Sequence, residues 1–177
     1  MSTKPGGMIT RIISGGQTGA DQAALDAAIE AGIPHGGWIP LGRKTEDGPL
    51  PETYRLRELP SAEYPARTEQ NVIDSDGTLI ISRGELTGGS DYTRRMAVRH
   101  RKPWIHIDAD TTSVDGAAAH IRAWVREHRI RVLNVAGPRA SADPDIYATT
   151  KTILRSFLHP CQENFRADHS RKNPEGA

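Results

Sequence analysis

The residues best suited to bind an anion form a glycine-rich turn between an apolar run and a helical pattern. The run ends at Ile13, and segment 14–19 reads Ser-Gly-Gly-Gln-Thr-Gly. Backbone N–H groups at the start of a helix, with the helix dipole, favour a negative charge. We therefore expect the phosphate of a ligand here. The expected contact residues are Gly15, Gly16, Gln17, Thr18, Gly19 and Asp21.

Two alternatives remain open at this turn. Asp21 is placed to contact a ribose or a magnesium ion, but an acidic residue is favourable at a helix start without any ligand. The glycines could serve only the backbone, because glycine permits positive φ and close packing. The turn departs from the dinucleotide fingerprint, since Ser14 stands at the first glycine position, and no Walker A Lys-Ser or Lys-Thr pair follows.

Two further glycine-rich turns follow apolar strand patterns. After segment 78–82, Thr-Leu-Ile-Ile-Ser, comes a turn whose expected ligand contacts are Gly88, Gly89, Ser90 and Thr93. Helix capping by Ser90 or Asp91 is the competing explanation for that turn.

The third turn follows segment 131–136 and contains Gly137 and Arg139. We expect the guanidinium of Arg139 to neutralise a phosphate, which its planar geometry suits. An ion pair with Asp143 is the alternative.

The segment 42–48 is a long excursion, Gly-Arg-Lys-Thr-Glu-Asp-Gly. Long loops inside a compact domain are usually functional or mobile, so we interpret it as a flap over the ligand. Arg43 and Lys44 are candidate phosphate partners, and a solvated turn is the alternative.

The elements that position these turns alternate between strand and helix, which predicts an α/β fold. We expect three layers: a mostly parallel sheet of about five strands, with helices on both faces. A second strand is expected at 37–39 and a helix at 67–74. Parallel strands place their carboxyl ends at one edge, so the three glycine turns should meet there. Residues 1–8 are expected to form a flexible arm, 9–158 a ligand-binding domain and 159–177 a polar, disordered tail.

Composition narrows the functional classes. The chain has 177 residues, 23 Lys and Arg against 22 Asp and Glu, and few aromatic residues, so nucleic acid and membrane partners are disfavoured. The single cysteine, Cys161, and the absence of a signal-peptide pattern predict a cytoplasmic protein. Seven dispersed histidines predict no metal site bound directly by the protein.

Five motifs together resemble a known family. They are Ser-Gly-Gly-Gln-Thr-Gly-Ala-Asp (14–21), Arg-Thr-x-x-Asn-Val (67–72), Ser-Asp-Gly-Thr-Leu-Ile (75–80), Thr-Gly-Gly-Ser (87–90) and Asn-Val-Ala-Gly-Pro-Arg (134–139). They are similar to motifs of the putative molybdenum carrier family, a circularly permuted YpsA-like branch of the SLOG superfamily that contains the LOG enzymes. Asn71, from the second motif, completes the predicted contact residues.

The resemblance implies a Rossmann-like domain that holds the molybdenum cofactor (molybdopterin) or a nucleotide. It also implies a homo-oligomer, a dimer or tetramer. LOG enzymes hydrolyse nucleoside 5′-monophosphates with a glutamate that follows their glycine motif, but Arg95 occupies that position here. Asp91 or Glu85 would have to replace the glutamate. We therefore expect a carrier or binding protein, keep a LOG-like phosphoribohydrolase as the alternative, and assign no catalytic residue.

Overall fold

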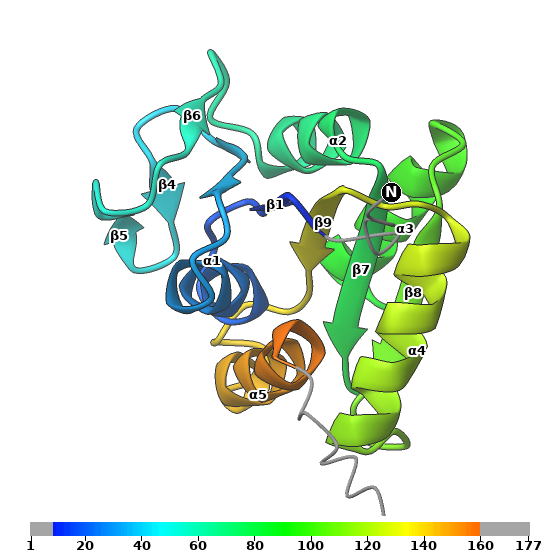
Figure 1. Ribbon diagram of the computed structural model, residues 1–177. Coiled ribbons are helices and arrows are strands. Elements are labelled where there is room, and N and C mark those ends of the chain that lie inside the picture. The colour runs from blue at the N-terminus through cyan, green and yellow to red at the C-terminus, as the bar shows by residue number, and fades with distance from the viewer. Residues whose placement is uncertain (1–8, 160–177) are drawn as a thin grey trace, which may run out of the picture.

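A five-stranded parallel sheet forms the centre of the computed structural model, which describes residues 9–159 (Figure 1). The strand order is β2-β1-β9-β7-β8, and every pairing in this sheet is parallel. The strands are β1 (Arg11–Ile13), β2 (His35–Gly36), β7 (Gly77–Ser82), β8 (Trp104–Asp108) and β9 (Val132–Ala136). The α/β class and the sheet of about five strands are thus confirmed, and the sheet is parallel throughout.

Five helices cover the two faces of the sheet. They are α1 (Ala20–Glu30), α2 (Tyr64–Asp74), α3 (Gly88–Arg99), α4 (Val114–Glu127) and α5 (Ile146–Leu158). Through α1 the chain passes from β1 to β2, and through α4 from β8 to β9, both moves being towards the β2 edge of the sheet. The chain moves towards the β8 edge when it enters β7 after α2 and when it passes from β7 to β8 through α3. Right-handed crossovers place these two pairs on opposite faces. Figure 1 shows α1 and α5 on one side of the sheet and α2 on the other.

The two faces of the sheet differ in polarity. Leu79, Ile81, Leu133 and Val135 belong to the main apolar core, together with residues of α1, α4 and α5. Alternate residues of the same strands point to the opposite face, beneath α2 and α3. There the positions include the buried polar residues Thr78, Ser82 and Asn134, and the apolar cluster between α2 and α3 is small, with Val72, Met96 and Ala97 as its buried members.

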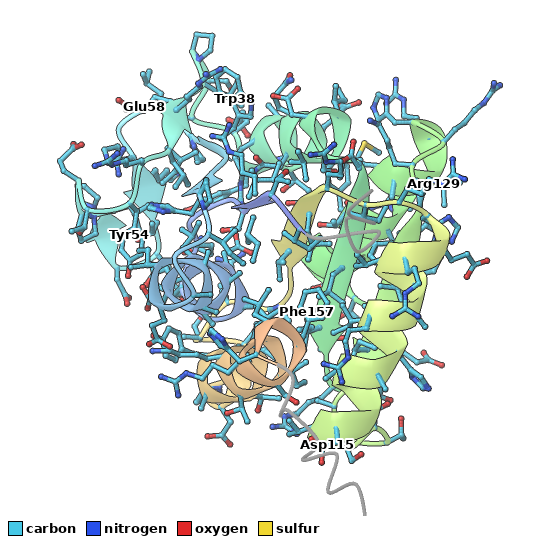
Figure 2. All side chains as sticks on the ribbon, viewed as in Figure 1. Trp38, Tyr54, Glu58, Asp115, Arg129 and Phe157 are labelled. Atoms are coloured by element: carbon cyan, nitrogen blue, oxygen red, sulfur yellow. The ribbon has the colours of Figure 1, made fainter. Side chains whose placement is uncertain are left out.

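An insertion between β2 and α2 packs against α1 and its preceding turn. It contains β3 (Trp38–Ile39) paired with β6 (Arg57–Glu58), and β4 (Lys44–Thr45) paired with β5 (Gly48–Pro49). Leu25 of α1 forms a second core with Ile39, Leu50 and Leu56. Figure 2 labels Trp38 and Glu58 in this insertion, above α1.

The sequence predictions need two boundary corrections. The expected second strand at 37–39 is wrong, because β2 ends at Gly36 and Trp38–Ile39 pairs with β6 in a separate sheet. Gly37 separates the two with φ 124°, a conformation that L-residues rarely adopt. Helix α2 begins at Tyr64, three residues earlier than predicted, because Pro65 is compatible with the first turn of a helix.

The arm predicted for residues 1–8 and nearly all of the predicted tail lie outside the described residues. Within residues 9–159, no helix has both the length and the apolar character needed to cross a membrane.

Candidate functional site

A cavity opens at the carboxyl edge of the sheet and extends under α2 and α3. Its volume is about 780 Å³, within the range typical of small-molecule sites. The helix that follows β7 lies on one face and the helix that follows β9 on the other, so these neighbouring strands mark the point where connections diverge. Ligands of open α/β sheets bind at such points. All three glycine turns contribute lining residues: Gly15, Gly88, Gly89 and Gly137.

The N-terminus of α3 leaves backbone donors free at this cavity. Thr87 precedes the helix and makes no side-chain cap, while the amides of Ser90 and Asp91 both donate to the carbonyl oxygen of Thr87, at 3.1 and 3.2 Å. Within the described residues, the amides of Gly88 and Gly89 have no acceptor. A Cβ at either glycine would meet open space. Free amides at the start of a helix are groups that can donate to an anion, and phosphate binding at the second turn stays a prediction.

The turn before α1 is occupied by its own side chains. The amide of Gln17 donates to Asp21 Oδ2 at 3.2 Å, and the amide of Thr18 donates to Gln17 Oε1 at 3.0 Å. The amide of Ala20 donates to the carbonyl oxygen of Pro138 at 3.2 Å. The Thr18 hydroxyl donates to Glu46. The amides of Gly16, Gln17 and Thr18 and the Thr18 hydroxyl, which were predicted to hold a phosphate, thus have partners within the protein.

Gly16, Thr18 and Gly19 lie outside the cavity lining. A Cβ on Gly16 would point to Leu50 and Leu56 of the insertion, away from the cavity. Of the first turn, Gly15, Gln17 and Asp21 reach the cavity wall.

Asp21 and Arg67 form a buried ion pair in that wall. Arg67 Nη1 lies 2.8 Å from Asp21 Oδ2, and the two side chains are 11 % and 6 % exposed. Complete burial raises the pKa of Asp21, while Arg67 and the amides of Gln17 and Gly15 act in the opposite direction. Arg67 Nε is buried and has no partner within the described residues. Asp21 engages Nη1 alone, so Nε stays a buried donor whose hydrogen-bonding capacity the described residues leave unused.

Three cations surround the ring of Tyr64 at the cavity wall. Lys44 Nζ lies 4.9 Å from the ring centroid, and the guanidinium carbons of Arg67 and Arg139 lie at 5.8 and 5.9 Å. Arg139 lines the cavity, and Asp143, its alternative partner, pairs with Arg83 Nε at 3.3 Å. The ion pair between Arg139 and Asp143, which was the alternative to a phosphate contact, is absent from residues 9–159.

Arg43 lies apart from the cavity. Its guanidinium donates to the carbonyl oxygens of Leu50, Pro51 and Tyr54 at 2.8, 2.9 and 2.7 Å, so it holds the insertion together. Lys44 does not line the cavity either, although it stacks on a residue that does.

The remaining predicted contacts line the cavity, but two of them are engaged. The side-chain amide of Asn71 makes two hydrogen bonds with the backbone of Trp38. It donates to the Trp38 carbonyl oxygen at 3.1 Å and accepts from the Trp38 N–H at 2.8 Å. The Thr93 hydroxyl donates to the carbonyl oxygen of Gly89 at 2.9 Å. Ser90 is 6 % exposed and lines the cavity beside them.

The carboxylates considered for catalysis are separated by the fold. Asp91 pairs with Arg94 at 2.8 Å and with Arg95 at 3.2 Å and lies outside the cavity lining. Glu85 lines the cavity as an exposed residue. Within the described residues, no cluster of three or more His, Cys, Asp or Glu side chains is arranged to hold a metal ion.

Many of the cavity residues were not predicted as contacts, among them Arg67, Tyr64 and Ser82. Arg67 belongs to the motif at 67–72, and its position four residues before Asn71 on one helix face was an available signal. Tyr64 and Ser82 carried no local signal, because only the packing of α2 over the end of β7 brings them to the cavity.

Comparisons with known proteins give a consistent assignment. Residues 12–158 match the circularly permutated YpsA SLOG family. A crystal structure titled as a putative molybdenum carrier protein from Syntrophus aciditrophicus SB is 56 % identical, covering 87 % of this chain and 98 % of that chain, with a TM-score of 0.86. A comparison with curated proteins found no match.

Proposed function

Because the chain belongs to the circularly permutated YpsA SLOG family, we propose that it is a carrier that binds a phosphate-bearing small molecule in the cavity at the sheet edge. The molybdenum cofactor is the first candidate cargo, because the 56 % identical relative is named a putative molybdenum carrier protein. A nucleotide is the second candidate, since a ring and a phosphate joined by a short linker fit the same volume.

One observation carries the proposal: unpartnered donors from two elements line the same cavity. The amides of Gly88 and Gly89 begin α3, and Arg67 on α2 keeps Nε without a partner. Helix N-terminal amides and arginine guanidinium groups are both well suited to bind phosphate. Arg139 at the cavity wall adds a further positive charge.

The proposal modifies the prediction from sequence. The phosphate is assigned to the start of α3, because the turn before α1 uses its amides internally. Asp21 serves there to hold Arg67, and Arg67 adds a positive charge to the wall of the same cavity.

Binding of ribose 5-phosphate tests the phosphate site directly. Replacement Gly89→Asp puts a carboxylate at the start of α3, where it competes for the same amides. We expect the affinity measured by calorimetry to fall at least about tenfold, because charge-assisted hydrogen bonds are lost. Gly89→Ala is the matched control, since its Cβ enters open space, and its affinity should stay near that of the wild type. Equal binding by Gly89→Asp would place the phosphate elsewhere.

Native mass spectrometry of the freshly purified protein tests the carrier function. A bound mass that leaves on denaturation identifies the cargo as pterin or nucleotide, and its absence from Gly89→Asp connects it to α3. The same spectrum tests the predicted dimer or tetramer.

The alternative, a LOG-like phosphoribohydrolase, is tested by base release from nucleoside 5′-monophosphates. Release that depends on Glu85, the carboxylate at the cavity wall, would replace the carrier proposal by an enzyme.

A further inference from the structure

A hydroxyl and an imidazole form an isolated pair at the wall of the cavity. Ser82, the last residue of β7, is 3 % exposed and lines the cavity. Its Oγ lies 2.8 Å from Nε2 of His106 on the edge strand β8. His106 pairs with Ile80 in register, so both side chains emerge on the face of the sheet beneath α2 and α3.

His106 is the outer member of this pair. It is half-buried on the edge strand, whereas Ser82 is buried. Partial burial lowers the pKa of His106, and the Asp108 carboxylate opposes that shift only in part. The imidazole is therefore neutral near pH 7, with a hydrogen on one nitrogen and a lone pair on the other.

The burial of Ser82 decides which nitrogen carries the hydrogen. If Nε2 carried it, Ser82 would accept, and its own hydrogen would need a second acceptor. Within the described residues Ser82 Oγ has no partner besides His106. A buried donor without an acceptor is costly, whereas an unused lone pair on oxygen costs less. If Nδ1 carries the hydrogen, Ser82 donates to Nε2. The Nδ1–H group then belongs to the imidazole of His106, which is more exposed than Ser82.

We propose that Ser82 is a specificity-determining acceptor, which His106 orients so that the oxygen lone pairs receive an amino or ring N–H group of the bound heterocycle. The inference rests on the proposed function, since it assumes that a phosphate-bearing ligand occupies the cavity. It adds the chemistry of the other end of that ligand: a ring that donates hydrogen bonds.

The tautomer of His106 can be measured without any ligand. In ¹⁵N-labelled wild-type protein near pH 7.5 we expect imidazole NMR to show His106 with Nδ1 protonated and Nε2 bare, the resonance being assigned by its absence from His106→Gln. His100 is the internal control, because its Nε2 faces Glu69 Oε1 at 2.7 Å and must carry a hydrogen. A protonated Nε2 on His106 would overturn the orientation and with it the proposal.

Ligand selectivity gives the second measurement. Two pairs of probes each differ by one amino group. The first pair is adenosine 5′-monophosphate and purine riboside 5′-monophosphate, and the second is guanosine 5′-monophosphate and inosine 5′-monophosphate. We expect the amino form of at least one pair to bind about three- to tenfold more tightly to the wild type, the contribution of one neutral hydrogen bond. Ser82→Ala should abolish this preference and leave ribose 5-phosphate binding unchanged.

Conservative variants separate orientation from general structural support. Ser82→Thr keeps a hydroxyl, and His106→Gln keeps an acceptor near Nε2, so both should retain the preference, whereas His106→Phe should lose it. Equal binding within both pairs, or a preference that survives Ser82→Ala, would overturn the proposal. Failure of ribose 5-phosphate to bind would instead defeat the proposed function.

Discussion

The turns that lead into α1 and α3 have similar sequences but opposite uses for their backbone amides. Before α1, Asp21 and Gln17 accept from amides of the turn, and the protein supplies its own anion. At the start of α3, the amides of Gly88 and Gly89 face the cavity without an acceptor. Two glycine-rich strand-to-helix turns of one sheet therefore differ in whether the protein's own side chains already accept from their amides.

The two acidic residues of these helices explain the difference. Asp21 and Asp91 both lie in the first turn of their helices. Asp21 is buried and directs its carboxylate to the turn and to Arg67. Asp91 directs its carboxylate to Arg94 and Arg95, one turn later on the same helix. The first arrangement supplies an acceptor to the turn amides, and the second leaves the amides of Gly88 and Gly89 without one.

Removal of the two acidic residues should give the largest contrast. Asp21→Ala leaves the buried Arg67 charge and the turn amides without a partner, so we expect the free energy of unfolding to fall by about 3–5 kcal/mol. Asp91→Ala breaks only partly exposed pairs and should cost less than about 1 kcal/mol. Urea denaturation of both variants measures the difference, and equal losses would contradict the distinction between the two turns.

Addition of one methyl group to each turn should give a smaller contrast. A Cβ on Gly15 would overlap the guanidinium of Arg67, whereas a Cβ on Gly89 meets nothing within 4 Å. We expect Gly15→Ala to destabilise by about 1–3 kcal/mol, as overpacking does. Gly89→Ala should stabilise by up to about 1 kcal/mol, because alanine is the better helix former. Thermal unfolding of both variants checks the signs, and destabilisation by Gly89→Ala would show that the start of α3 is less open than described.

The pH dependence should give the smallest effect, at the other end of α1. Glu30 accepts from Arg155 and Lys151, and these hydrogen bonds lower its pKa from 4.5 to about 2. Since the folded pKa lies below the unfolded one, the stabilisation is complete above about pH 4.5 and is lost as the pH falls towards 2. Glu30→Gln should flatten the loss of thermal stability in this interval.

The control for this change is Glu127→Gln on α4, since Glu127 has no ion pair within residues 9–159. If Glu30→Gln loses thermal stability at low pH as the wild type does, the contacts of Glu30 with Arg155 and Lys151 do not stabilise α1. Asp21 would then be the acidic residue that distinguishes α1 from α3.

Much of the architecture could be predicted from local patterns. The segment that forms β7 could be recognised because burial on both faces makes it continuously apolar. The amphipathic helices could be recognised because burial of one face imposes a helical period on the sequence. The short strands could not, since two-residue elements such as β2 and β3 have no period. Their division at Gly37 depends on a backbone conformation that pairing with β1 and β6 selects.

The site could be predicted in outline and not in detail. The sequence identified the three turns because glycine and serine mark strand-to-helix junctions. It could not show that Arg43 donates its hydrogen bonds to carbonyl oxygens of the insertion. Nor could it show that Arg67 pairs with Asp21, which lies 46 positions earlier in the chain.

The sequence alone determined that three glycine turns end three strands of one sheet, because strand and helix periods and glycine positions are local properties. Only the tertiary structure decided which turn remains open. That outcome depends on where the side chains beside each turn point: Gln17 and Asp21 accept from amides of the first turn. The ion pair with Arg67 on α2, a distant segment, accompanies this orientation of Asp21.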